Sequence, residues 1–191
     1  MQVRELAVPG AVEVSPTLHA DARGTVLEMF RADVVEELTG HRFDLAQANV
    51  SVNRRGALRG LHVAEVPPGQ AKYVTCLVGA VFDVVVDVRV DSPTFGVWDA
   101  VLLDDVDRRA VLVPEGFAHG FLALEDGSTV GYLCSAPYSP ATEHTIDAYD
   151  DTVGITWPTT GRDGLPLEHL LSERDASAPS LKAWAQRPSR A

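Results

Sequence analysis

The stretch GAVFDVVVDVR, residues 79–89, decides the fold class of this 191-residue chain. In an extended chain its side chains alternate between two faces, one carrying Phe82, Val84, Val86 and Val88 and the other Asp83, Val85, Asp87 and Arg89. Strict alternation over this length predicts a β-strand. Similar stretches rich in β-branched residues occupy 72–78, 97–103, 110–113 and 128–134.

Turn residues separate these stretches at short intervals, in the clusters VPPGQ, DSPTFG, DDVDRR, PEGFAHG, LEDGS and SAPYSP. The 15 glycines and 12 prolines leave little room for long helices. One short helix is expected to begin after Asp33, with a capping box to Glu36, and to end at Gly40; another is expected at 181–186. Many short strands at near-regular spacing predict an all-β antiparallel sandwich or barrel.

The length, apolar runs and net charge of the chain limit the classes of protein to which it can belong. We expect one domain over residues 1–191, with a loose tail after about Ala183. No run approaches the roughly 20 apolar residues that span a bilayer, and the start MQVRELAVPG lacks the apolar core of a secretory signal. We therefore expect a cytoplasmic protein with no membrane partner. The net charge of −11 argues against nucleic-acid binding, which depends on positive charge.

Several kinds of chemistry lack their sequence motifs. There is no GxSxG nucleophile motif and no phosphate-binding glycine pattern. Cys76 and Cys134 form no CxxC motif, so we expect buried, reduced thiols. Metal-dependent cupins carry two histidines separated by one residue, but Val63 and Ala64 follow His62. We therefore expect no bound metal.

A basic region, NRRGALRGLH (53–62) followed by GQAKYV (69–74), stands out instead. An isolated His62 would most simply be a half-buried structural histidine. However, Arg59, His62 and Lys72 come within 14 residues on two consecutive predicted strands, and burying three such groups unpaired is costly. They are better explained by a bound anion. Because Arg59 and His62 differ in strand parity, both can face one pocket only if the chain bulges, and Gly60 is the expected place.

Ten motifs in order carry a family resemblance: DARGT with Glu28 (21–28), QANVSVN (47–53), GALRGLH (56–62), GQAKYV (69–74), GAVFDVVVDVR (79–89), SPTFG (92–96), PEGFAHGF (114–121), YLCSAPYSP (132–140), GITWP (154–158) and LLSERD (170–175). From about residue 5 to 182 the chain resembles the dTDP-4-dehydrorhamnose 3,5-epimerases. PPGQAKYVTC and the QAN variant resemble members from antibiotic deoxysugar pathways more than members that make cell-wall rhamnose.

The resemblance implies a cupin-type jelly roll (a double-stranded β-helix) with a few short peripheral helices. It also implies a homodimer that exchanges N-terminal strands and needs neither metal nor organic cofactor. The implied substrate is a dTDP-linked 4-keto-6-deoxyhexose, whose configuration is inverted at C3, C5 or both through an enolate.

Site roles follow from the same resemblance. His62 matches the base, Asp175 the carboxylate that pairs with it, Lys72 the cation near the C4 oxygen, and Tyr132 the acid on the opposite face. Tyr138 matches a tyrosine that stacks on thymine. The positions that match substrate-binding residues are Arg23, Glu28, Gln47, Asn49, Arg59, His119, Tyr138, Glu143 and Arg174.

The chain departs from common family residues at several places: Ala48, Ala64–Glu65, Leu133 and Ala148–Tyr149. None of these removes a catalytic group, but they leave double versus single epimerisation open. The alternatives are a single-site C3 or C5 epimerase, a non-catalytic cupin that binds a sugar nucleotide, and a metal-dependent cupin oxygenase or isomerase.

Overall fold

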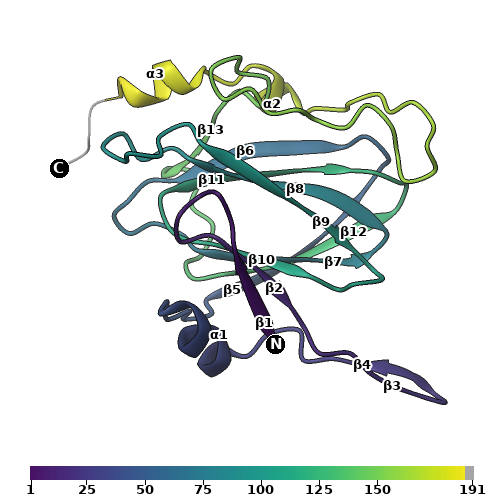
Figure 1. Cartoon of the computed structure of the whole chain (residues 1–191). Helices are drawn as coiled ribbons and strands as arrows, with labels where there is room; N and C mark the ends of the chain where they lie inside the picture. The colour runs from purple at the N-terminus through teal and green to yellow at the C-terminus, as the bar shows by residue number, and fades with distance from the viewer. Residues whose placement is uncertain (188–191) are drawn as a thin grey trace.

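The computed structural model describes residues 1–187 and is built mainly from β-strands (Figure 1). In chain order the elements are β1 (Gln2–Glu5), β2 (Val12–Ser15), β3 (His19–Asp21), β4 (Gly24–Val26), α1 (Ala32–Thr39), β5 (Gln47–Asn53), β6 (Leu58–Ala64), β7 (Lys72–Val78), β8 (Ala80–Asp87), β9 (Trp98–Asp104), β10 (Ala110–Val113), β11 (Phe117–Ala123), β12 (Ser128–Cys134), β13 (Glu143–Thr145), α2 (Glu173–Ala176) and α3 (Leu181–Ala185). The predicted strands at 72–78, 110–113 and 128–134 are confirmed to the residue.

Two antiparallel sheets pack face to face (Figure 1). One has six strands in the order β1-β2-β10-β7-β12-β5, and the other has five in the order β13-β6-β11-β8-β9. Most neighbours in a sheet are distant in sequence, as in a jelly roll, where the chain crosses repeatedly between two sheets. The predicted all-β cupin-type fold is confirmed.

Strand β8 is buried on both faces, which explains why both faces carry apolar side chains. Val81 and Val85 pack between the two sheets, in a cluster that includes Val74. Val84 and Val86 pack on the other face, against a cluster of C-terminal residues that includes Trp157 and Leu181. The segment from Ile146 to α3 therefore covers the outer face of the five-stranded sheet, as the yellow-green chain in Figure 1 shows.

The turn after β8 is organised around the fully buried carboxylate of Asp87. It accepts hydrogen bonds from Ser92 Oγ at 2.6 Å, Thr94 Oγ1 at 2.7 Å and Arg89 Nη2 at 2.8 Å. Burial alone would raise the pKa of Asp87, but these donors outweigh it and hold the pKa well below its usual range. The carboxylate is therefore ionised and bonded in the folded state.

The helices are short and differ in detail from expectation. Helix α1 starts one residue before Asp33 and its N-cap is Arg31, which makes no side-chain capping bond. The predicted capping box is wrong because Asp33 pairs with the Arg31 guanidinium at 2.5 Å and does not cap the helix. Gly40 ends the helix in the left-handed conformation, as predicted.

Helix α3 is confirmed at 181–185, and the indole of Trp184 donates to Val88 O at 2.9 Å. The end of the predicted loose tail, residues 188–191, lies outside the described residues.

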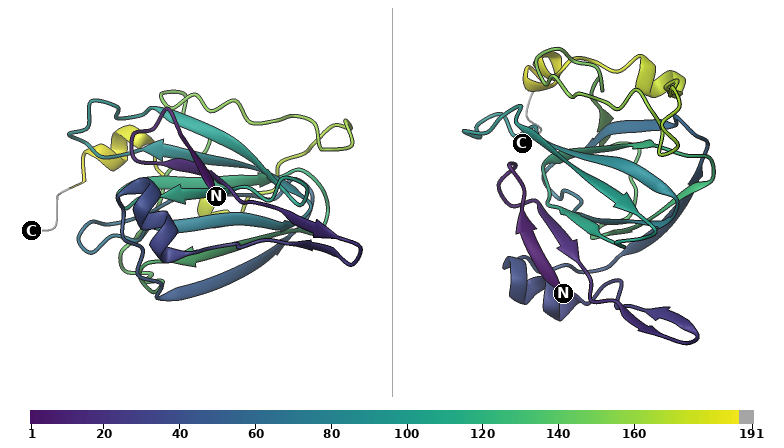
Figure 2. Two further views of the ribbon diagram at one scale, coloured as in Figure 1. Left: turned by 60° about the horizontal axis from the view of Figure 1, so that its bottom comes forward. Right: turned by 45° about the vertical axis from the view of Figure 1, so that its right-hand side comes forward.

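The β3–β4 hairpin projects from the body of the molecule (Figure 2). Each of its strand residues is exposed. Across residues 1–187, no helix has the length and apolar character that a bilayer span requires.

Candidate active site

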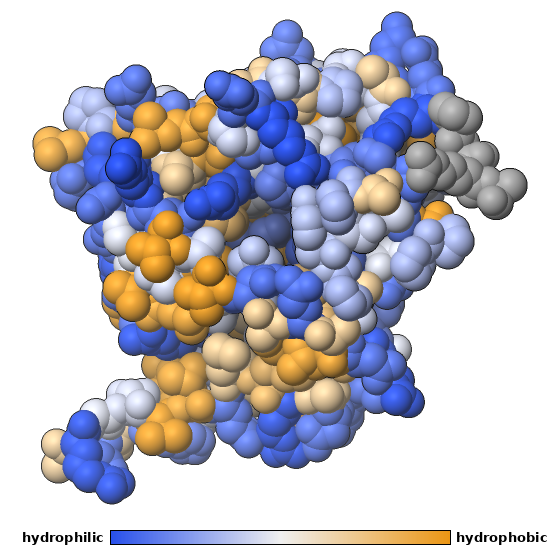
Figure 3. Space-filling view, turned by 180° about the vertical axis from the view of Figure 1, so that it is seen from behind, coloured by the Kyte–Doolittle hydropathy of each residue, from blue (hydrophilic) through white to orange (hydrophobic). Residues whose placement is uncertain are grey.

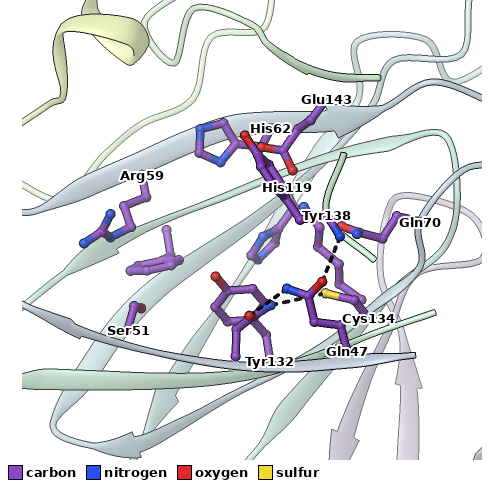
Figure 4. Close-up of a pocket in the computed structure, with 13 residues that line it drawn as sticks. Gln47, Ser51, Arg59, His62, Gln70, His119, Tyr132, Cys134, Tyr138 and Glu143 are labelled. Atoms are coloured by element: carbon purple, nitrogen blue, oxygen red, sulfur yellow. Dashed lines mark hydrogen bonds between the residues drawn. The ribbon is translucent and has the colours of Figure 1, made fainter. Parts of the chain in front are cut away.

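A cavity of about 370 Å³ opens between the two sheets (Figure 4). This volume lies within the range of roughly 300–1,000 Å³ typical of small-molecule sites. Its lining residues are Gln47, Asn49, Ser51, Arg59, His62, Gln70, Lys72, His119, Phe121, Tyr132, Cys134, Tyr138 and Glu143. Nine of the thirteen sequence-predicted site residues are in this set, and three of the nine are predicted catalytic groups: His62, Lys72 and Tyr132.

Most of the residues that line the cavity lie two positions apart on a strand, so that their side chains point to the same face of the sheet. On β5, Gln47, Asn49 and Ser51 face the cavity, whereas Val50 and Val52 on the opposite face are 64% and 70% exposed. The same spacing of two relates the other lining pairs: Gln70 and Lys72, His119 and Phe121, and Tyr132 and Cys134. The residues predicted from sequence do not include Ser51, Gln70, Phe121 or the cavity position of Cys134. Each of them lies two residues from a predicted one, so the period of the strand would have found them.

A β-bulge at Gly60 brings Arg59 and His62 to the same cavity. These residues are three apart on β6 but pair with residues of β11 that are only two apart. Gly60 has φ +131°, and a Cβ there would lie 2.6 Å from Gly120 Cα. The predicted bulge is confirmed, and two glycine backbones meet where it forms.

His62 and Asp175 form an ion-pair-like contact, with 2.9 Å between Nε2 and Oδ1. Asp175 arrives on α2, whose N-cap Ser172 accepts a hydrogen bond from the Asp175 backbone N–H at 3.1 Å. Burial would raise the pKa of Asp175, but the hydrogen bond and charge of His62, with Ser172 and the Gly60 backbone, give a net lowering. A carboxylate is thus held ionised behind the imidazole.

Lys72 and Tyr132 line the cavity from the six-stranded sheet. Figure 4 shows Tyr132 across the cavity from His62. Burial lowers the pKa of Lys72, and the nearby charges of Glu143, Cys134 and Asp83 oppose this only in part. Burial also raises the pKa of the Tyr132 phenol, which keeps its proton. The cavity therefore places a lysine amine and a phenolic proton donor across from a histidine–carboxylate pair.

His119 is fixed by a residue that the sequence did not single out. Its Nε2 lies 2.8 Å from Asp83 Oδ2, and both side chains are buried. In the sequence, Asp83 is only one member of the alternating pattern of β8. Because alternation does not reveal which distant strand a face meets, nothing in the pattern connected Asp83 to His119.

Polar contacts connect the remaining cavity residues. The Arg59 Nε donates to Asn53 Oδ1 at 2.8 Å. Gln47 Nε2 donates to Asn49 Oδ1 at 2.8 Å, while Gln47 Oε1 accepts from the backbone N–H of Tyr138 at 2.8 Å (Figure 4). These bonds hold the amide side chains in fixed orientations at the cavity wall.

Arg174 lies beside the cavity rather than in it. Its guanidinium is 3.7 Å from the Glu143 carboxylate and donates to Glu143 O at 3.2 Å. Both residues also line a neighbouring hollow between β13 and the C-terminal helices. Arg174 can therefore act on the cavity through Glu143.

Two predicted substrate-binding residues are not brought to the cavity by this chain. Arg23 is at the tip of the projecting hairpin, with its side chain 89% exposed and paired with Asp21 at 2.6 Å. Glu28 follows the hairpin and lies 3.5 Å from Arg31. Among residues 1–187 there is also no group of three or more His, Cys, Asp or Glu side chains placed to hold a metal ion.

Comparison with known sequences gives consistent matches over most of the chain. Residues 5–183 match the family model described as dTDP-4-dehydrorhamnose 3,5-epimerase. A dTDP-4-dehydrorhamnose 3,5-epimerase of Mycolicibacterium smegmatis is 58% identical over 181 residues, which are 95% of this chain and 86% of the relative.

Solved structures agree. A 4-keto-6-deoxy sugar epimerase from the novobiocin biosynthetic gene cluster of Streptomyces spheroides superposes with a TM-score of 0.89 at 49% identity, covering 96% of this chain and 88% of that one. A 3'-monoepimerase from Streptomyces bikiniensis, solved in complex with dTDP-quinovose, superposes with a TM-score of 0.85 at 47% identity, covering 93% and 86%. Relatives therefore include enzymes named for double inversion and for single inversion.

Proposed function

The chain belongs to the dTDP-4-dehydrorhamnose 3,5-epimerase family, and on this premise we propose that it inverts a dTDP-linked 4-keto-6-deoxyhexose at C3, at C5 or at both carbons. It is an epimerase and hence an isomerase. The observation that carries the proposal is the cavity between the sheets, which has His62 with Asp175 on one side and Lys72 with Tyr132 on the other.

The reaction begins with proton removal by His62. The C4 ketone makes the hydrogens on C3 and C5 acidic enough for a positioned base, so the step needs neither a metal nor an organic cofactor. Imidazole is the side chain best suited to exchanging protons near neutral pH. Asp175, 2.9 Å from the ring, orients it and stabilises the imidazolium that forms.

The enolate is stabilised and reprotonated from the facing sheet. The Lys72 ammonium would balance the charge that develops on the C4 oxygen, in a buried position where such an interaction is stronger than in water. Tyr132 would then donate a proton to the carbon from the face opposite His62. The placement of His62 on β6 and Tyr132 on β12, in different sheets, supports delivery to opposite faces of one sugar ring.

The nucleotide would occupy the cavity mouth. Arg59 has the fork geometry that binds two phosphate oxygens at once, and Tyr138 offers a ring for stacking on the base. Tyr138 is half exposed and its backbone is fixed by Gln47, which supports this role. His119, Asn49 and Glu143 line the same cavity and would contact the sugar.

We propose that the working form is a single-domain, cytoplasmic homodimer with exchanged N-terminal strands. The projecting β3–β4 hairpin supports this, because its residues find no contact surface in their own chain. Val26 on the hairpin and Val50 and Val52 on β5 are exposed apolar residues, and Figure 3 shows apolar groups gathered near the base of the hairpin. Arg23 and Glu28 would then complete the partner's cavity.

Mixed dimers test the exchange directly. Arg23→Ala and His62→Ala should each be inactive alone, because each lacks one essential group in both cavities. After mixing and subunit exchange, about a quarter of cavities should regain both groups in symmetric dimers that reassort at random. No recovery, with mixed dimers shown by mass spectrometry, would place Arg23 outside the partner's cavity.

Isotope exchange tests the reaction and separates the alternatives. The protein is incubated with dTDP-4-keto-6-deoxyglucose in D₂O, and deuterium is located by NMR. Deuterium at C3 and C5 indicates a double epimerase, and deuterium at one carbon indicates a single-site enzyme. No exchange, with binding retained, would leave a sugar-nucleotide-binding cupin. The control is His62→Asn, which should reduce exchange by about 10²–10⁴-fold if His62 is the base.

A further inference from the structure

Asp83 is a buried carboxylate beside the cavity, and only one of its two oxygens has a hydrogen-bond partner among the described residues. Asp83 is 1% exposed, and its Oδ2 lies 2.8 Å from His119 Nε2. Its other oxygen, Oδ1, is buried and has no hydrogen-bond partner among the described residues. Burying a charge is costly unless an opposite charge compensates it. The contact with His119 therefore does not by itself explain why a carboxylate is buried at position 83.

Strand parity indicates the compensating charge. Asp83 has the same parity on β8 as Val81 and Val85, which pack between the two sheets. Lys72 has the same parity on β7 as Val74, which packs in that cluster from the other sheet. The two side chains therefore point into the same interior from opposite sheets, and the negative charge of Asp83 favours the ammonium form of Lys72.

Other titratable and charged groups also face Lys72. Around the cavity these are Arg59 and His62 on β6, His119 on β11, Tyr132 and Cys134 on β12, and Glu143 on β13. Of the two carboxylates that favour the ammonium form of Lys72, Glu143 has the larger effect and Asp83 the smaller. Glu143 also lies 3.7 Å from the Arg174 guanidinium, which shares its charge. Among the described residues, Asp83 forms no ion pair with an arginine or lysine, so its charge is the less shared of the two.

We propose that Asp83 is a positioning residue with two tasks: one carboxylate oxygen orients His119, and the charge of the group keeps Lys72 protonated across the cavity. The catalytic consequence depends on the function proposed above for Lys72. The charge state of Lys72 does not depend on that function, so it can be tested without measuring the reaction.

The lysine content of the chain makes this test direct. The chain has two lysines, Lys72 and Lys182. Protein labelled with ¹³C at the lysine ε-carbon therefore gives two signals, and exposed Lys182 on α3 is an internal reference. Asp83→Asn keeps an oxygen that can accept from His119 and removes the charge.

The titration midpoint of Lys72 should fall by about one pH unit or more in Asp83→Asn, the usual effect of removing a nearby opposite charge. The signal of Lys182 should not change. An unaltered Lys72 midpoint would overturn the proposal whether or not the protein epimerises sugars.

Activity gives the second readout. Because Lys72 acts as a cation, kcat is lost as pH rises through its pKa. In Asp83→Asn this alkaline loss should move to lower pH by the same amount as the NMR midpoint, while KM changes little. A uniform loss of kcat at every pH would instead indicate that Asp83 only supports His119.

A stability cycle covers the case in which Asp83→Asn folds poorly. Removing one member of a buried charge pair destabilises a protein, whereas removing both can be nearly neutral. The thermal midpoints of Asp83→Asn, Lys72→Met and the double variant are compared. The double variant should unfold at a higher temperature than Asp83→Asn. Additive losses would show that the two charges are not coupled and would refute the proposal.

Discussion

Replacing Gly60 with alanine tests whether the bulge in β6 builds the site. An alanine Cβ would lie 2.6 Å from Gly120 Cα and 2.9 Å from His119 O, both backbone atoms that cannot rotate away. Such overpacking costs about 1–3 kcal/mol. Holding a side chain at φ +131° adds roughly 1–3 kcal/mol. The free energy of unfolding should therefore fall by about 2–6 kcal/mol, a large share of the ~5–15 kcal/mol typical of a domain.

Urea denaturation measures this loss, and Gly24→Ala is a matched control. Gly24 has a nearly identical φ of +135°, but a Cβ there would meet nothing within 4 Å. Gly24→Ala should therefore lose only the conformational part. The folded fraction of Gly60→Ala should also lose about 10²-fold in kcat, because a shift of about 1 Å in His62 is enough to do so. Equal losses of stability in the two variants would refute the close-contact argument.

Three further predictions follow from other contacts. Asp175→Asn should lower kcat by about 10–100-fold with little change in KM, because a hydrogen bond to a charged group contributes about 1.5–3 kcal/mol; steady-state kinetics with kcat within twofold of the wild type would contradict this. In Tyr132→Phe, deuterium exchange by His62 should outlast inversion, which should fall about 10²–10⁴-fold; equal losses would exclude Tyr132 as a separate acid. Asp87→Asn should lower the thermal midpoint at pH 7, and the difference from the wild type should shrink below about pH 4. A carboxylate whose pKa is lower in the folded than in the unfolded protein stabilises the fold above its unfolded pKa, and this stabilisation is lost as pH falls. A constant difference in thermal midpoint down to pH 3 would show that the charge of Asp87 is unimportant.

The local sequence patterns were enough to predict many of the strands in the two sheets. The alternation in β8 and the β-branched runs of β7, β10 and β12 were sufficient because a strand's character depends on its own residues. The bulge was predictable as well, since Arg59 and His62 could share a pocket only through a break in parity, and Gly60 allows one. Helix α1 shows the limit of this approach, because Asp33 had a competing local partner in Arg31.

The pairing of distant segments could not be predicted in this way. Asp83 and Val84 point to opposite faces of the sheet, and both are buried. Val84 is buried because the C-terminal segment covers the second face of the sheet. Alternation alone could not say which face holds the site. The role of Asp175 depended on family resemblance, since the sequence around it indicates only a helix start.

The His62–Asp175 contact also has a consequence for the order in which the site is made. The two residues are 113 positions apart, and every strand of both sheets lies before Asp175 in the chain. Chains are synthesised from the N-terminus and begin to fold during synthesis. A nascent chain with both sheets complete would still have an imidazole without its carboxylate. Within one chain, the His62–Asp175 contact therefore forms only after the two sheets that build the rest of the cavity.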